Sequence, residues 1–61
     1  MKVSEMKRKL KKAGCYKVRE GTRHEIWCSP KTGEEFPVSR HNTEELPPGT
    51  ANSILKAAGL K

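Results

Sequence analysis

The stretch Gly21-Thr22-Arg23-His24 places a hydroxyl, a guanidinium and an imidazole next to one another, where a loop leads into a predicted strand. An imidazole can accept or donate a proton near neutral pH, and one well-placed general acid or base accelerates a reaction by about 10²–10⁴-fold. Arg23 and the backbone amides around Gly21 and Thr22 are suited to binding a phosphate group. His24 is therefore the candidate catalytic residue. The alternative is an ordinary histidine at the end of a strand.

The positive charge of the chain is concentrated in its first part. The 61 residues carry a net charge of +6. Residues 1–24 hold nine Lys or Arg against two Glu, an excess of +7, whereas the remainder holds four against five Glu, an excess of −1. A basic block of this kind favours a polyanion such as nucleic acid, which it binds through counterion release. A solvated helix face that keeps the protein in solution would explain the same charge.

Apolar periodicity and turn residues predict two helices that flank three strands. Apolar residues at helical spacing predict a first helix with Ser4 as its cap, running to about Ala13 and stopped by Gly14. A second helix should begin at Pro47-Pro48 and end at Gly59.

Between the helices, alternation predicts strands over residues 16–19, 24–29 and 35–39, with a turn at residues 30–33. The first of these should be half-buried through Tyr16 and Val18, and Pro37 indicates that the third lies at a sheet edge or lacks one ladder hydrogen bond. We therefore expect a single α+β domain over residues 1–61, in which a three-stranded antiparallel sheet carries both helices on one face.

The second predicted strand leaves the environment of Trp27 open. If this strand alternates regularly, Trp27 shares a face with Glu25, and that face would be the open one that also carries Lys17 and Arg19. An indole there could stack on a base or dock against a protein partner. The alternative is a core tryptophan, turned inward by a bulge.

Several classes of protein are disfavoured by the composition. Two cysteines are too few for a disulfide framework and lack the spacing of a zinc site. The four Glu of the two adjacent pairs, Glu34-Glu35 and Glu44-Glu45, should diverge within each pair, so no metal site is expected. The N-terminus is charged and no apolar run is long enough to span a membrane. We expect a cytoplasmic protein without a metal or a small-molecule cofactor.

Four segments together resemble the HicA family of bacterial toxins, and they are distributed over essentially the whole chain. They are Gly21-Thr22-Arg23-His24 with Ile26, the turn Ser29-Pro30-Lys31-Thr32-Gly33, Val38-Ser39-Arg40-His41, and Gly49-Thr50-Ala51-Asn52-Ser53-Ile54-Leu55-Lys56-Ala57-Ala58-Gly59-Leu60. The chain departs from the family in having Thr22 where serine is common and Cys15 where many relatives carry a large aromatic residue.

The resemblance implies an α-β-β-β-α fold like that of double-stranded-RNA-binding domains. It also implies the toxin of a type II toxin–antitoxin system, an endoribonuclease that cleaves messenger RNA and is neutralised by a HicB antitoxin. His24 would be its catalytic residue. This is chemically consistent, because RNA carries its own nucleophile, the 2′-hydroxyl, and the protein need only transfer protons and stabilise charge on the phosphate, without a metal.

The expected RNA contacts are basic and polar residues of the first helix, the first strand, the loop before His24 and the loop after the third strand: Lys7, Lys11, Lys17, Arg19, Thr22, Arg23, Arg40 and His41. His41 has three possible roles, namely a second proton-transfer group, a phosphate contact or a polar loop residue. The last two are favoured, because nothing in the sequence brings His41 to His24. The alternative function for the whole chain is a non-catalytic module that binds double-stranded RNA or another nucleic acid.

Overall fold

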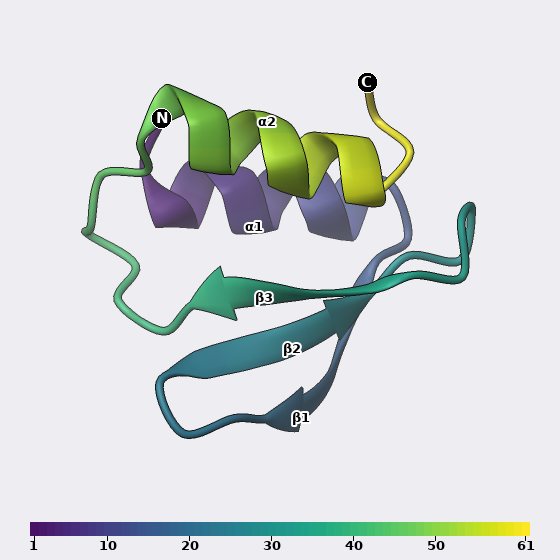
Figure 1. The fold of residues 1–61 in the computed structure, drawn as a ribbon, viewed down its shortest axis with the longest axis horizontal. Coiled ribbons are helices and arrows are strands. Elements are labelled where there is room, and N and C mark those ends of the chain that lie inside the picture. Colours follow the sequence, from purple (N-terminus) through teal and green to yellow (C-terminus); the bar gives the residue numbers. More distant parts are fainter.

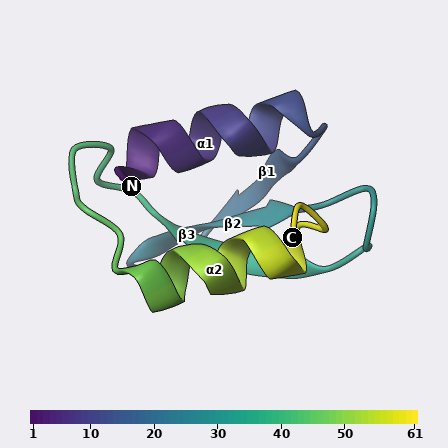
Figure 2. The same ribbon diagram turned by 90° about the horizontal axis from the view of Figure 1, so that it is seen from above.

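The five elements predicted from the sequence are present and in the predicted order. A computed structural model describes residues 1–61, with α1 (Val3–Lys12), β1 (Tyr16–Glu20), β2 (His24–Cys28), β3 (Glu35–Ser39) and α2 (Pro48–Ala57). The strands form one antiparallel sheet in the order β1-β2-β3. Both helices lie on the same face of this sheet (Figure 1, Figure 2). The predicted α+β architecture, like that of double-stranded-RNA-binding domains, is confirmed.

Both helices end at the glycines that the sequence marks. Gly14 and Gly59 have φ angles of 90° and 78°, in the left-handed region that glycine adopts without a steric penalty. After α2, the N–H of Leu60 donates to the carbonyl of Leu55 at 2.8 Å, which is the six-to-one bond of a Schellman motif. The chain leaves α1 by the same motif. Local sequence therefore fixes where each helix stops.

The start of α1 differs from the prediction. The helix begins at Val3, its N-cap is Lys2, and no side chain caps it, so the expected cap by the Ser4 hydroxyl is wrong. Backbone carbonyls of the loop before α2 take that role: the N–H of Val3 donates to the carbonyl of Glu44, and the N–H of Ser4 to that of Asn42, both at 3.0 Å. The first N–H groups of a helix need such partners, and here a distant segment supplies them.

The β2–β3 turn holds the C-terminal end of α2. The buried Ser29 hydroxyl donates to the carbonyl of Ala58, and the exposed Thr32 hydroxyl donates to that of Ala57, each at 2.7 Å. These carbonyls would otherwise be among the unpaired groups at the end of a helix. The polar residues of this turn therefore attach the second helix to the sheet.

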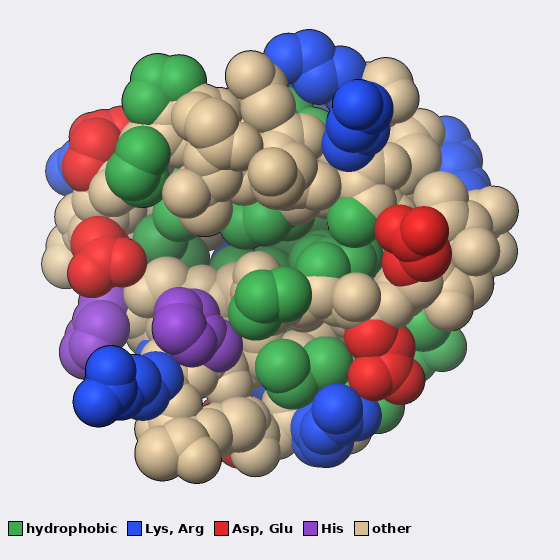
Figure 3. Space-filling view, viewed as in Figure 1, with side chains coloured by type: hydrophobic (Ala, Val, Ile, Leu, Met, Phe, Trp, Pro, Cys, Tyr) green, Lys and Arg blue, Asp and Glu red, His purple; other side chains and the backbone are tan.

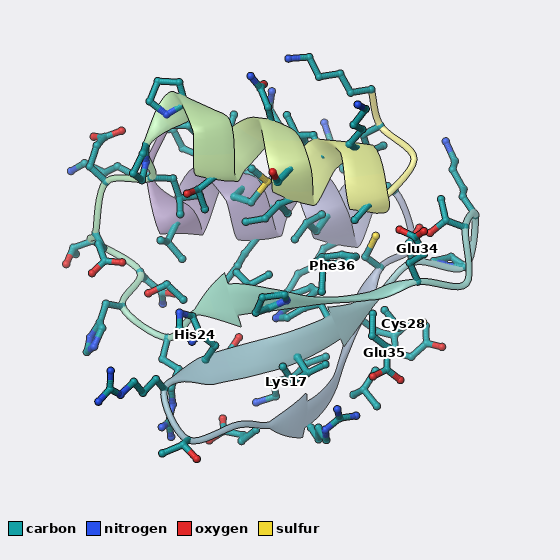
Figure 4. All side chains as sticks on the ribbon, in the orientation of Figure 1. Lys17, His24, Cys28, Glu34, Glu35 and Phe36 are labelled. Carbon is teal, nitrogen blue, oxygen red and sulfur yellow. The ribbon has the colours of Figure 1, made fainter.

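Buried apolar side chains form one core between the sheet and the helices. Figure 4 shows Phe36 pointing from β3 toward the helices. The strands contribute only β2 and β3 residues to this core, and both helices contribute from their inner faces. Its members are Val3, Met6, Leu10, Cys15, Trp27, Phe36, Val38, Leu46, Ala51, Ile54 and Ala58.

The first strand is exposed along its whole length, so the predicted half-buried pattern is wrong. Tyr16 is 53% exposed and Val18 43%, because β1 lies at the edge of the sheet while the core lies over β2 and β3. A register shift between Lys17 and Arg19 also places these two side chains on opposite faces of the sheet, with Lys17 beside Trp27 and Arg19 beside Ile26. The other edge strand is β3, so the expected edge position of Pro37 is confirmed.

Trp27 is a core residue, 3% exposed, and the open-face interpretation is wrong. It does share a face with Glu25 and with its ladder partner Lys17, as regular alternation predicts, but this face is the one that the helices cover. His24 and Ile26 therefore lie on the opposite, open face. No bulge in β2 is needed, because the β2–β3 register is continuous.

Candidate active site

His24 begins β2 and is presented by a tight hairpin loop, residues 21–23. The N–H of Gly21 donates to the His24 carbonyl at 2.7 Å. A Cβ atom at Gly21 would lie 2.9 Å from that carbonyl oxygen, closer than real Cβ contacts allow. Glycine is therefore required for the close approach that fixes the His24 backbone, while the imidazole itself stays exposed.

Arg40 ties this hairpin to the end of β3. Its guanidinium donates to the Thr22 carbonyl at 3.1 Å and to the Glu20 carboxylate at 2.8 Å. The pKa of the exposed Glu20 carboxyl lies below its usual value, because Lys17 hydrogen-bonds to it and because Lys17 and Arg40 are both positively charged. Glu20 therefore stays ionised and keeps its bond to Arg40.

The β2–β3 ladder brings the second histidine to the first. His24 is paired with Ser39, and the Ser39 hydroxyl accepts the N–H of His41 at 3.1 Å. The two histidines therefore line one open cavity of about 490 Å³, together with Thr22, Arg23, Ser39, Arg40 and Glu44. Figure 3 shows the histidine side chains close together on one face, beside Lys or Arg side chains, and Figure 4 places His24 at the end of the sheet away from Cys28.

The cavity is rich in cations that can meet a phosphate. It contains two guanidiniums and a single carboxylate, that of Glu44. Arg40 uses part of its guanidinium within the fold, whereas Arg23 is exposed and belongs to none of the ion pairs of the chain. Imidazoles beside an unpaired arginine can transfer protons next to a bound phosphate.

Lys7 lies elsewhere, in a network below α1. Its ammonium is 3.1 Å from the Glu25 carboxylate and 2.8 Å from the Asn42 side-chain oxygen. Burial raises the pKa of the Glu25 carboxyl, but hydrogen bonds from the Trp27 indole and from Lys7 outweigh it and hold the pKa below its usual value. The charge of Lys7 is therefore used inside the fold.

Three of the four other expected RNA contacts lie together in a second place. Lys7, Lys11 and Lys17 line a groove where α1 passes the β1 side of the sheet, and Lys11 is exposed. Lys17 also pairs with Glu20 at 3.1 Å. Arg19 lies on the open face, where it pairs with Glu35 at 3.0 Å. The structure thus brings together Thr22, Arg23, His24, Arg40 and His41, and it places the remaining four apart from them.

No group of three or more His, Cys, Asp or Glu side chains is arranged to hold a metal ion. Both cysteines are free thiols, Cys15 in the core and Cys28 partly exposed at the far end of β2. Neither helix has the length and apolar character needed to cross a membrane. The groups available for chemistry in the cavity are therefore the two imidazoles, the guanidiniums, two hydroxyls and one carboxylate.

Comparison with known protein families shows to which family the chain belongs. The family model described as the HicA toxin of bacterial toxin–antitoxin systems matches residues 3–60. The chain belongs to the HicA family. No curated protein and no solved structure gives a significant match. Membership in a toxin–antitoxin family implies that this HicA toxin has an antitoxin partner.

Two cavity residues of this HicA toxin were not among the predicted site residues. Ser39 holds the backbone of His41, and Glu44 lines the same cavity as the arginines. The Ser-x-His spacing is a usable signal for the first, because a serine hydroxyl commonly accepts the N–H two residues on. The sequence contains no comparable signal for Glu44.

Proposed function

We propose that this HicA toxin is a metal-independent endoribonuclease that cleaves messenger RNA, with His24 as a general acid or base. The observation that carries the proposal is the placement of an exposed imidazole, on a backbone fixed by the Gly21 hydrogen bond, in a cavity with the unpaired Arg23. Membership in a family of toxins supports a nuclease role.

In this proposal the RNA supplies the nucleophile and the protein moves the protons. The 2′-oxygen attacks the neighbouring phosphorus while His24 transfers a proton, and Arg23 neutralises charge that builds up on the non-bridging oxygens. Arg40 acts mainly by holding the hairpin, through the Thr22 carbonyl and Glu20. The Thr22 hydroxyl, on the rim of the same cavity, is available to a phosphate oxygen.

We assign contacts with the RNA backbone outside the cavity to exposed lysines. Lys11 and Lys17 line one groove with solvent-accessible ammonium groups, and phosphate contacts of this kind add affinity without sequence preference. Lys17 and Arg19 are both in surface ion pairs, with Glu20 and Glu35, and their side chains stay 45% and 61% exposed. Arg19 is left out of this assignment because it lies on the open face of the sheet, away from the groove. Lys7 lines the groove, but its side chain is only 13% exposed and is held by Glu25, so it is assigned to the fold.

The test is cleavage of a messenger RNA transcript by the purified full chain in the presence of EDTA. We expect cleavage that resists the chelator and falls by at least about 10²-fold in His24→Ala. The exposed His24 ring makes no hydrogen bond within the chain, so the variant should keep the wild-type circular dichroism spectrum and melting temperature. Full cleavage by the folded variant would contradict the assignment. RNA binding without any product, in wild type and variant alike, would select the non-catalytic binding module.

A further inference from the structure

A second imidazole lies where the cleavage reaction needs a second proton-transfer group. His41 follows β3 by two residues and lines the same cavity as His24. Two hydrogen bonds hold the backbone of His41: its N–H donates to the Ser39 hydroxyl at 3.1 Å, and its carbonyl accepts the N–H of Glu44 at 3.0 Å. The backbone is thus held on both sides while the ring is exposed and makes no hydrogen bond within the chain.

His24 shows the same combination of a fixed backbone and a free ring. Its carbonyl is held by Gly21, and its ladder partner is Ser39, the residue that also holds His41. One serine therefore connects the two histidines through backbone and hydroxyl contacts. Catalytic groups need such preorganisation, because misplacement by about 1 Å can cost about 10²-fold in rate. A histidine that served only to solvate the loop would not need it.

The chemistry of the proposed reaction calls for two groups on opposite sides of the phosphate. The bond from O2′ to phosphorus forms as the bond from phosphorus to O5′ breaks, leaving a 2′,3′-cyclic phosphate and a 5′-hydroxyl. A base takes the proton from the 2′-hydroxyl, and an acid gives one to the departing 5′-oxygen. In an in-line displacement these two oxygens lie on opposite sides of the phosphorus, so a single imidazole on one side cannot reach both.

Given the endoribonuclease activity proposed above, on which this inference rests, we infer that His41 is the second catalytic residue and forms an acid–base pair with His24. The two rings come from different elements, the start of β2 and the loop after β3, and both line the same cavity. Arg23 lies on the same cavity and is free to hold the phosphate between them. Glu44 is the competing candidate for the second group, because its carboxylate also lines the cavity.

The closing experiment uses two RNA oligonucleotides that differ in one atom at the cleaved bond. In the second, sulfur replaces the bridging 5′-oxygen, so that the leaving group departs without being protonated. We expect His24→Ala and His41→Ala each to lower cleavage of the normal substrate by about 10²–10⁴-fold. On the sulfur substrate, one of the two variants should recover to within about tenfold of wild type, and the other should stay impaired.

The pH dependence gives an independent readout. Two imidazoles in opposite protonation states give a bell-shaped rate profile, so each single histidine variant should lose one limb of the bell. Glu44→Gln should keep both limbs. Loss of a limb in Glu44→Gln and not in His41→Ala would overturn the inference in favour of the carboxylate.

Several other results would also overturn it. His41→Ala that cleaves the normal substrate at the wild-type rate would exclude a catalytic role. If both His24→Ala and His41→Ala lose activity equally on the two substrates, neither histidine protonates the departing oxygen, and the acid–base pair is refuted. In either case an inactive His24→Ala leaves the proposed function standing, whereas a fully active His24→Ala removes the proposed function itself. His41→Gln serves as a second variant, and the melting temperature of each confirms that it folds.

Discussion

The ion pair between Lys7 and Glu25 offers a test of which basic residues stabilise the fold and which bind the substrate. The two charged groups lie 3.1 Å apart, and their side chains are only 13% and 15% exposed. Exposed pairs contribute about 0.2–1 kcal/mol, whereas removing one partner of a fully buried pair costs about 3–5 kcal/mol. For side chains with this intermediate burial we expect Lys7→Met to lower the free energy of unfolding by about 2 kcal/mol.

A double-mutant cycle in urea measures the pair itself. We expect Lys7→Met and Glu25→Gln to show a coupling energy of about 1–2 kcal/mol. Glu25→Gln keeps a side-chain oxygen for the Trp27 indole, which bonds to Glu25 at 3.0 Å. For a chain of this size, Lys7→Met should lower the melting temperature by about 8–16 °C. Lys11→Met, an exposed lysine on the same helix, is the control and should change stability by less than about 0.5 kcal/mol. A coupling energy below about 0.3 kcal/mol would refute the reasoning.

The same pair predicts how stability depends on pH. The pKa of Glu25 is lowered in the folded protein, so the unfolded chain binds the proton more tightly. The stabilisation is therefore present above the ordinary glutamate pKa of about 4.3 and is lost as the pH falls through the lower pKa of the folded state. Glu25→Gln should consequently lose less stability than wild type between neutral and acid pH. An identical loss in both proteins would count against the pair.

Three further predictions concern the β2–β3 turn, the hairpin before His24 and the lysine contacts with the RNA backbone. Ser29→Ala should lower the free energy of unfolding, measured in urea, by about 1–3 kcal/mol, because it leaves a buried helix carbonyl unpaired. Thr32→Val removes an exposed hydroxyl and should lower it by about 1 kcal/mol or less. Equal losses in the two variants would contradict the burial argument. Gly21→Ala should reduce RNA cleavage at least tenfold with a small loss of stability, since the new Cβ displaces the hairpin; unchanged cleavage would contradict the geometry. Lys11→Met should lower the salt dependence of RNA binding by about one unit of slope, and Lys7→Met should not; the reverse result would show that the assignments are exchanged.

The features that depend on neighbouring residues could be predicted from the sequence. Gly14, Gly59 and Pro48 act within one or two turns of a helix, so the helix ends follow from residue type. Pro37 cannot donate to a ladder, and this restricts it to an edge. The order of the elements and their arrangement as a sandwich follow from the same local signals.

The incorrect predictions share one physical cause, since each depended on a partner far away in the chain. A serine near the start of a helix is a common cap, but loop carbonyls already occupy the N–H groups of Val3 and Ser4. Alternation shows which residues share a face, as for Lys17 and Trp27, but both faces of a strand alternate equally well. Which face is buried depends on where the helices pack.

The candidate site divides in the same way. Thr22, Arg23 and His24 are adjacent in the sequence, so their meeting in one cavity was predictable. His41 joins them only because β3 returns alongside β2, which no local pattern shows. Conversely, the lysine at position 7 looked free because its partner, Glu25, lies on another element.

The loop that caps α1 also supplies His41 and Glu44 to the cavity, and this has a consequence for the order of folding. The hydrogen bonds from α1 to this loop join residues about 40 positions apart, whereas the strand pairings join close neighbours in sequence. Long-range closure loses more chain entropy and is expected to follow the local hairpins. A newly made chain should therefore have its His24 hairpin early but acquire the complete cavity only when its first helix docks, so that activity arises with the last long-range contact.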